Sequence, residues 1–314
     1  MPIRIGLKTQ YDRMLYHLNR LTTDLSDLQA QAASGIKFDK PSDAPVDLVS
    51  TLKYRKAIEE IDRYQKSIQE AESYLQALDK SYEALEDIVI RAKELALQGA
   101  NDTLNSQDRV AISEEIWNLL EEAISIANSK QNGRYIFAGN KPIGYENGPF
   151  EMEKTPLPNG DILIKISYLG GKEDLYQGYS FNQKVLVGKN GEEALQKSGI
   201  FETLVNLYRT LRNNNEADTV KETKDIDNAL ENLNKTLLYL TKEHADIGAK
   251  LNHMELKKNL YEDLKMSIQE NLSKTQDVDL LKVASEIKSK ETAYQAALAA
   301  SAKVMQMSLV NFLS

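Results

Sequence analysis

Few side chains in this sequence are of the types that perform catalysis or hold a metal. The chain has three histidines, His17, His244 and His253, and no cysteine. The lack of cysteine excludes disulfides, thiolate metal sites and a cysteine nucleophile. Neither an HExxH motif nor the Ser/His/Asp order of a hydrolase is present. His244 falls at a core position of a helical repeat, which favours a packed or hydrogen-bonded residue over a metal ligand.

Three short segments have some of the residues of a ligand-binding loop. Asp39-Lys40-Pro41-Ser42-Asp43 has two acids but lacks the ligand spacing of a calcium loop. Gly170-Gly171-Lys172 and Gly188-Lys189-Asn190-Gly191 lack the GxxxxGK(S/T) spacing that aims backbone amides and a lysine at one phosphate. We interpret both glycine segments as turns. The sequence therefore predicts no catalytic, cofactor-binding or metal site, and no enzymatic activity.

Composition argues against two classes of partner. The net charge of -8 does not suit nucleic acid, whose phosphates require clustered Lys and Arg. No apolar run approaches the ~20 residues that span a bilayer, so membrane insertion is not expected. The N-terminus has no apolar segment followed by small residues, so we expect no cleaved signal peptide.

The chain is organised instead by helices that carry narrow apolar stripes. Between residues 7 and 32 the apolar side chains recur in alternating steps of four and three, the heptad pattern of a helix that buries one stripe against another. These positions are Leu7, Tyr11, Met14, Leu18, Leu21, Leu25, Leu28 and Ala32. A helix with so narrow a stripe is not stable alone, so the pattern predicts a partner helix.

Two longer segments carry the same repeat and predict helices of about fifty residues each. The first contains two interleaved series with strict seven-residue spacing, which are Ile61, Ile68, Leu75, Tyr82, Val89 and Ala96, and Tyr64, Ala71, Leu78, Leu85 and Ala92. The second runs from Ile226 to Leu272. A shorter helix is expected from Ser106, and the Asn132-Gly133 turn ends it.

Residues 141–191 have the composition of a small β-rich domain, with eight glycines among them. Ile162, Ile164 and Ile166 recur with the period of two that is typical of a strand. Helix is expected to return from Glu192 to Arg212.

The last segment, Leu280 to Ser314, predicts a helix whose length and narrow stripe match those of residues 7–32. We predict that these two helices pair and bring the chain termini together. The sequence thus predicts a mainly α protein: an elongated coiled-coil rod built from the N- and C-terminal segments, with a small β-rich domain inserted in the middle.

Several segments resemble the bacterial flagellin superfamily. Leu25–Gly35 (LSDLQAQAASG), followed by Pro41–Pro45 (PSDAP), is similar to its N-terminal signature, as is Arg91–Asn101 (RAKELALQGAN). Lys290–Ser314 is similar to its C-terminal region. Asn132–Gly139 (NGRYIFAG) resembles the motif that opens the inserted domain in the hook–filament junction members of the superfamily. That motif and the short insert favour a junction member over a filament flagellin.

The resemblance implies a division into three parts. Residues 1–45 and 273–314 are expected to pair as an inner, axial coiled-coil domain. Residues 46–140 and 192–272 are expected to form a helical rod domain, and residues 141–191 an outer β-rich domain. The implied spoke turn between the inner domain and the rod comprises Ser34, Gly35, Pro41, Ser42, Asp43 and Pro45.

The resemblance also implies an assembly interface on the stripes of the two terminal helices. Its expected residues are Leu7, Tyr11, Met14, Leu18, Leu21, Leu25, Leu28, Ile287, Tyr294, Leu298, Met305, Leu309 and Phe312. Packing of these helices against neighbouring subunits is expected to order them during assembly.

The function implied by the resemblance is that of a structural adaptor, which joins the flagellar hook to the flagellin filament. The implied partners are the upstream hook–filament junction protein, flagellin, further copies of the chain and an export chaperone. The chain is expected to leave the cell through the flagellar type III apparatus and to lie outside it in the flagellum. Two alternatives remain open, a self-polymerising filament flagellin and a generic coiled-coil tether.

Overall fold

The structure is mainly helical, as the heptad repeats predicted. The computed structural model describes residues 3–38, 44–100, 106–156, 162–212 and 219–313. None of the helices in these ranges is long and apolar enough to cross a membrane. The same ranges contain no group of three or more His, Asp or Glu side chains that could hold a metal ion.

The chain forms two compact units. The first comprises residues 1–61 and 263–314, and the second comprises residues 62–262. Two long helices, α2 (Pro45–Gly99) and α5 (Thr219–Gln276), contribute residues to both units. With 55 and 58 residues they confirm the two long helices predicted from the seven-residue spacing.

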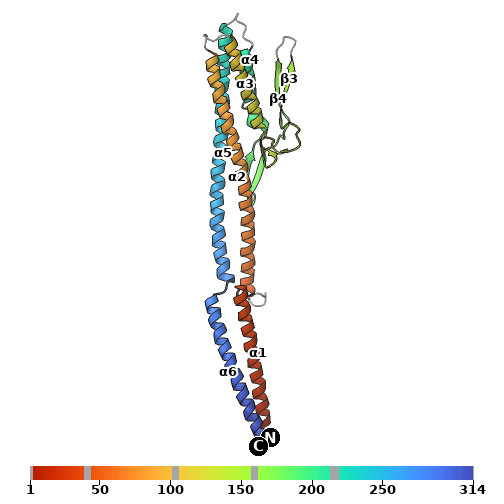
Figure 1. The fold of residues 1–314 in the computed structure, drawn as a ribbon, viewed down its shortest axis with the longest axis vertical. Helices are drawn as coiled ribbons and strands as arrows, with labels where there is room; N and C mark the ends of the chain where they lie inside the picture. Colours follow the sequence, from red (N-terminus) through yellow and green to blue (C-terminus); the bar gives the residue numbers. More distant parts are fainter. Residues whose placement is uncertain (1–2, 39–43, 101–105, 157–161, 213–218, 314) are drawn as a thin grey trace. The chain divides into compact units, whose positions relative to one another are not determined.

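The first unit contains α1 (Ile3–Ser34) and α6 (Leu280–Leu313). The two helices lie side by side along their length (Figure 1). They are antiparallel, because Asp24 near the end of α1 contacts Lys290 near the start of α6. The predicted pairing of the terminal helices is confirmed.

The second unit has a continuous core formed by α2, α3 (Ser106–Ala127), α4 (Ile200–Arg212) and α5. Both seven-residue series of α2 supply buried residues to this core, namely Ile68, Ala71, Leu75, Leu78, Tyr82, Leu85, Val89, Ala92 and Ala96. From α5 they meet Leu233, Leu240, Ile247 and Met254. Because their apolar side chains face the core, the heptad positions of α2 are covered on several sides by other elements.

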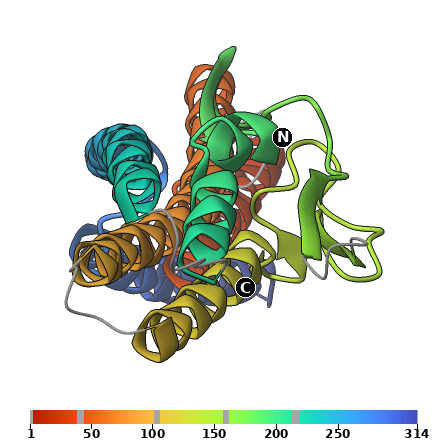
Figure 2. The same ribbon diagram turned by 90° about the horizontal axis from the view of Figure 1, so that it is seen from above.

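The described residues contain six short strands, two just before the β-rich insert and four within it. They are β1 (Lys130–Gln131), β2 (Arg134–Tyr135), β3 (Phe150–Pro156), β4 (Ile162–Tyr168), β5 (Leu175–Ser180) and β6 (Gln183–Gly188). In the described residues they form three antiparallel pairs, β1–β2, β3–β4 and β5–β6. The β3–β4 pair lies beside α3 and α4, on the side away from α5 (Figure 2). The strand predicted from alternating isoleucines is confirmed as β4.

The helical segment predicted for residues 192–212 begins and ends where expected, but it is interrupted. The segment begins as a π-helix, η1 (Glu192–Gln196), and α4 starts only at Ile200. Gly199 interrupts the helix with a positive φ of 73°, a conformation that glycine adopts without steric cost. The Ser198 hydroxyl also donates to the Leu195 carbonyl at 2.6 Å, which turns the chain between the two helical pieces.

His244 of α5 is bound by two carboxylates of α2. Its Nδ1 lies 3.1 Å from Glu86 Oε1, and its Nε2 lies 3.1 Å from Asp79 Oδ1. Tyr82, one turn from each acid, stacks on the imidazole ring. The residue is thus a hydrogen-bonded bridge between two core helices, as its heptad position predicted.

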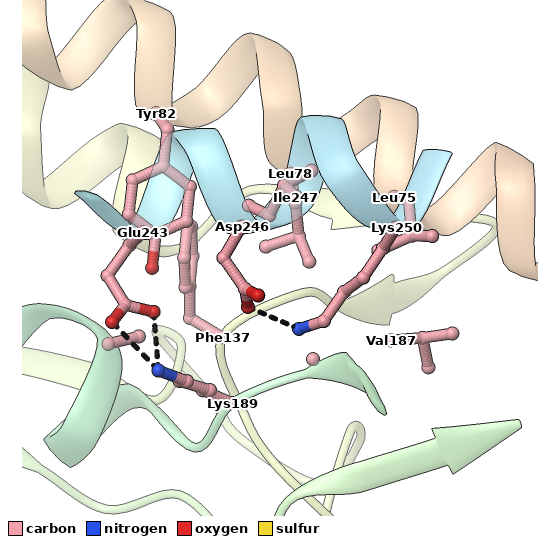
Figure 3. A pocket seen from close by; sticks show the side chains of 12 residues that line it. Leu75, Leu78, Tyr82, Phe137, Val187, Lys189, Glu243, Asp246, Ile247 and Lys250 are labelled. Carbon is pink, nitrogen blue, oxygen red and sulfur yellow. Dashed lines mark hydrogen bonds and ion pairs between the residues drawn. The ribbon is translucent and has the colours of Figure 1, made fainter. Parts of the chain in front are cut away.

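A second polar bridge joins α5 to the insert. Lys189, which follows β6, forms an ion pair with Glu243 of α5, with 2.6 Å between Nζ and Oε2 (Figure 3). Glu243 is only 8% exposed, and the pair borders a small cavity of about 20 Å³ beside Tyr82 and Phe137. Partial burial lowers the pKa of Lys189, but the hydrogen bond and charge of Glu243 outweigh it and raise the pKa overall.

We expect Lys189→Met to lower the free energy of unfolding by about 3 kcal/mol, because it leaves the buried Glu243 carboxylate without its counter-charge. The double variant Lys189→Met/Glu243→Leu should recover most of that loss, since no unpaired charge then remains. Urea unfolding followed by circular dichroism measures both. Equal losses in the single and double variants would contradict the prediction.

Candidate assembly interface

The contact between α1 and α6 is built from a seam of half-buried side chains. On α1 the seam follows the predicted heptad positions Met14, Leu18, Leu21, Leu25 and Leu28, each of which is partly covered. Tyr11 remains 44% exposed. Each of these side chains is covered by α6 and stays open to solvent on its flanks, as in any pair of helices without a third helix beside it.

On α6 the seam lies one position away from part of the predicted stripe. Its covered residues recur in heptad steps and are Val283, Ile287, Lys290, Tyr294, Ala297, Ser301 and Val304. Leu298 and Met305 belong to the predicted interface but lie outside this seam, and they are 44% and 48% exposed. Ile287 and Tyr294 are shared by both sets. The two large side chains therefore lie outside the contact with α1.

An ion pair fixes the register of the two helices. Lys290 Nζ lies 2.6 Å from Asp24 Oδ2. The hydrogen bond from Lys290 holds the pKa of Asp24 below its ordinary value, although desolvation opposes this effect. Because the folded pKa is lowered, the contribution of the pair to stability is present at neutral pH and is lost as the pH falls through the acidic range.

Beyond the helical pair, the turn after α1 is hydrogen-bonded to the turn before α6. The Lys37 amide donates to the Gln276 carbonyl at 2.8 Å, and the Val278 amide donates to the Gly35 carbonyl at 2.9 Å. These bonds form an isolated antiparallel bridge between Ile36 and Asp277. We call residues 35–37 and 276–278 the clasp.

Gly35 gives the clasp its direction. It follows the last residue of α1 with a φ of 73°, and its amide donates to the Gln31 carbonyl at 2.9 Å. This is the left-handed helix end that glycine favours, because a Cβ would be strained there. Arg55 of α2 adds a side-chain bond to Gln276, with 2.9 Å between Nη2 and Oε1.

The pair also has an apolar groove on its surface. The groove has a volume of about 400 Å³ and is lined by Arg13, Met14, His17, Ala297, Ala300 and Val304. Small alanines on α6 let a further side chain approach the helix axis closely. An apolar groove on the surface of a helix pair is typical of a surface that contacts another molecule.

Not all predicted interface residues can be placed. The side chains of Leu7, Leu309 and Phe312 lie outside the described residues, as do Pro41, Ser42 and Asp43 of the predicted spoke turn. Of the other turn residues, Ser34 ends α1, Gly35 belongs to the clasp and Pro45 begins α2.

Sequence reasoning missed the clasp and most of the α6 seam. Gly35 after a heptad segment signalled a helix end, but nothing in the local pattern pointed to residues 276–278 as its partner. Ala297 and Ser301 gave a weak apolar signal beside the larger Leu298 and Met305. At these positions the larger apolar side chains therefore lie on the outer face of α6, while the seam uses small residues.

Comparison with protein families gives two matches. The bacterial flagellin N-terminal helical region matches residues 8–142, and the bacterial flagellin C-terminal helical region matches residues 226–313. Together these regions contain most of α1 and α5 and the whole of α2 and α3, with α6. The chain belongs to the bacterial flagellin family. As a family member it is a structural component of the flagellum and not an enzyme.

Comparison with individual proteins also finds flagellar relatives. The chain is 22% identical over 326 aligned residues to flagellar hook-associated protein 3 of Escherichia coli K12, covering 98% of each chain. It is 25% identical to flagellin FlaB1 of Treponema pallidum, covering 71% of this chain and 68% of that protein. A putative flagellar hook-associated protein from Vibrio parahaemolyticus has a similar fold, with a TM-score of 0.62, 16% identity, and coverage of 75% of this chain and all of that structure.

We expect Gly35→Val to destabilise the first unit of this flagellin-family chain by about 1–3 kcal/mol, since a β-branched residue is strained at positive φ. Gly248→Ala in α5 is the matched control, because no atom lies within 4 Å of the added Cβ and alanine favours helix. Circular dichroism during heating should show earlier melting for Gly35→Val only. Equal melting of both variants would show that the clasp does not depend on this backbone conformation.

Proposed function

We propose that this chain is the adaptor that joins the flagellar hook to the flagellin filament. The observation that carries the proposal is its alignment with hook-associated protein 3, which runs over 98% of both chains and so includes the insert. The match to a flagellin is limited to about seven tenths of each chain. An adaptor that joins two parts of the flagellum works by binding and needs no catalytic residue.

In this proposal the three parts of the chain have separate tasks. Residues 1–45 and 273–314 form the axial domain, residues 46–140 and 192–272 form the rod, and residues 141–191 face outward. The exposed Leu298 and Met305 and the groove between α1 and α6 support the first assignment, because they offer apolar surface to a neighbouring helix.

The mechanism is mechanical. Ordering a residue of a terminal helix costs about 1–2 kcal/mol of backbone entropy. Burying a large apolar side chain against a neighbour returns about 1.5–3 kcal/mol. The two quantities nearly balance in a free pair that is only half buried, so contact with the growing tip shifts the balance toward order. Subunits therefore stay separate until they meet the assembly.

The partners in this proposal are the upstream hook–filament junction protein, flagellin, copies of the same chain and an export chaperone. In this proposal the chain is exported through the flagellar type III apparatus. A sequence without cysteine supports passage of an unfolded chain, because it cannot form disulfides on the way.

Seeded assembly tests the proposal. Purified chain is added to isolated hooks, with and without the upstream junction protein, and the hooks are imaged by electron microscopy. We expect a short terminal zone that depends on the upstream protein and then stops. Long tubes that grow without limit would make the chain a filament flagellin, and absence of binding would favour a generic coiled-coil tether.

We expect Leu298→Asp/Met305→Asp to reduce incorporation into hook tips at least about tenfold, the equivalent of 1.4 kcal/mol. The charges would lie on the outer face of α6, where a neighbouring subunit packs, and they leave the seam with α1 intact. Leu238→Asp is the matched control, since Leu238 is an exposed leucine of α5 in the second unit. Normal incorporation of the double variant, with unchanged circular dichroism, would contradict this interface.

A further inference from the structure

The β3–β4 hairpin of the insert has an outer edge that faces α4. Successive residues of an antiparallel strand direct their backbone N–H and C=O groups alternately toward and away from the partner strand. The Leu169 amide, just after β4, donates to the Pro149 carbonyl at 2.8 Å. The odd-numbered residues of β4 therefore face β3, and Ile162, Ile164 and Ile166 direct their backbone groups outward.

Two side chains cap this edge and leave a gap between them. Arg209 Nη2 donates to the Ile162 carbonyl at 2.8 Å, and Gln196 Nε2 donates to the Ile166 carbonyl at 3.4 Å. Between these caps, the described structure shows no protein partner for the outward backbone groups of Ile164. An unpaired strand edge is a template for another extended chain.

A groove runs along the gap, between β4 and α4. It has a volume of about 440 Å³, and its floor consists of the buried side chains of Ile164, Phe201 and Val205. Its rim is polar and is formed by Lys165, Gln196, Glu202, Asn206 and Arg209. The groove thus combines an apolar floor, which rewards burial of a side chain, with open backbone groups beside it.

The charge of the rim favours an acidic occupant. Arg209 Nε is buried and has no hydrogen-bond partner among the described residues, although its Nη2 is used at the strand edge. A buried N–H without an acceptor requires an explanation, and an acceptor from a bound molecule supplies one. Lys165 adds a second positive charge to the rim, against the single carboxylate of Glu202.

We propose that this groove binds an extended, acidic segment of a second polypeptide, which adds to β4 as a short third strand. One backbone residue of that segment pairs with Ile164, one apolar side chain lies on Phe201 and Val205, and one carboxylate accepts from Arg209. This mode of binding takes affinity from backbone hydrogen bonds and specificity from alternate side chains. A helix has no free backbone groups to offer Ile164, so the partner segment is extended.

Synthetic hexapeptides test the proposal. The probe is a fluorescein-labelled, blocked Thr-Glu-Val-Glu-Val-Thr peptide, titrated with the full chain and followed by fluorescence anisotropy. Two companions carry either Lys in place of Glu or N-methylated valines, which cannot donate along the strand. We expect saturable binding of the acidic peptide and binding at least about tenfold weaker for both companions. Equal binding of all three, or no binding of the acidic peptide at about millimolar chain, would overturn the proposal.

Variants at the rim separate this site from general attraction of an acidic peptide. Asn206 is exposed and only borders the groove, so Asn206→Glu should weaken acidic-peptide binding about tenfold and Asn206→Lys should strengthen it. Arg209→Met should weaken it in the same direction. Lys184→Met is the matched control, because Lys184 is an exposed lysine of the other hairpin. Circular dichroism and fluorescence of the single tryptophan, Trp117, verify folding.

Loss of binding in Lys184→Met equal to that in Asn206→Glu would overturn the site, since it would show attraction to any positive charge of the insert. A second copy of the chain is the other occupant that the experiment distinguishes. Sedimentation velocity of the chain without peptide should show no self-association that Asn206→Glu abolishes. Such self-association would replace the second polypeptide by a neighbouring subunit and overturn the proposal as stated.

Discussion

A heptad seam covered by only one other helix is the constraint on which the first unit depends. The seam residues Met14, Leu18, Leu21, Leu25 and Leu28 of α1 are half buried, because α6 covers them on one side and leaves them partly open to solvent. Apolar burial contributes in proportion to the area removed from water, so each such residue contributes only part of its full value. The pair is therefore able to fold and still has apolar surface to bury. That combination is what an assembling subunit requires and what a free-standing domain avoids.

In the second unit the same seven-residue repeat builds a core that other elements cover on all sides. In α2 the heptad residues are almost completely buried, since α3, α4, α5 and the insert surround them. These residues contribute their full burial to the stability of a single chain. Polar bridges then fix how these elements meet: His244 joins α5 to two turns of α2, and Lys189 joins the insert to Glu243. Such bridges are costly to break singly, and they favour one arrangement over its neighbours.

The insert is held by mixed contacts and not by a core of its own. Lys154 of β3 lies 4.2 Å from the centre of the Trp117 ring, and Trp117 packs in turn against Tyr208 of α4. Asn128 caps the inner end of β3 by accepting from the Phe150 amide and donating to its carbonyl. A two-stranded sheet is marginal by itself, so these contacts with the helices are what keep the hairpin in place. They also leave the middle of the β4 edge uncapped.

The sequence by itself determined the long helices of this protein, their approximate lengths and the membership of the chain in the flagellin family. Seven-residue spacing is a local property, and it predicts a helix and its apolar face wherever the repeat is long and regular. Alternating isoleucines predicted β4 for the same reason. The tertiary structure decided which face of α6 meets α1, where Ala297 and Ser301 are covered while Leu298 and Met305 are not. It also decided that residues 35–37 bond to residues 276–278, and that Arg209 reaches the edge of β4. These features depend on contacts between residues far apart in the chain, and no local pattern records which distant residues will meet.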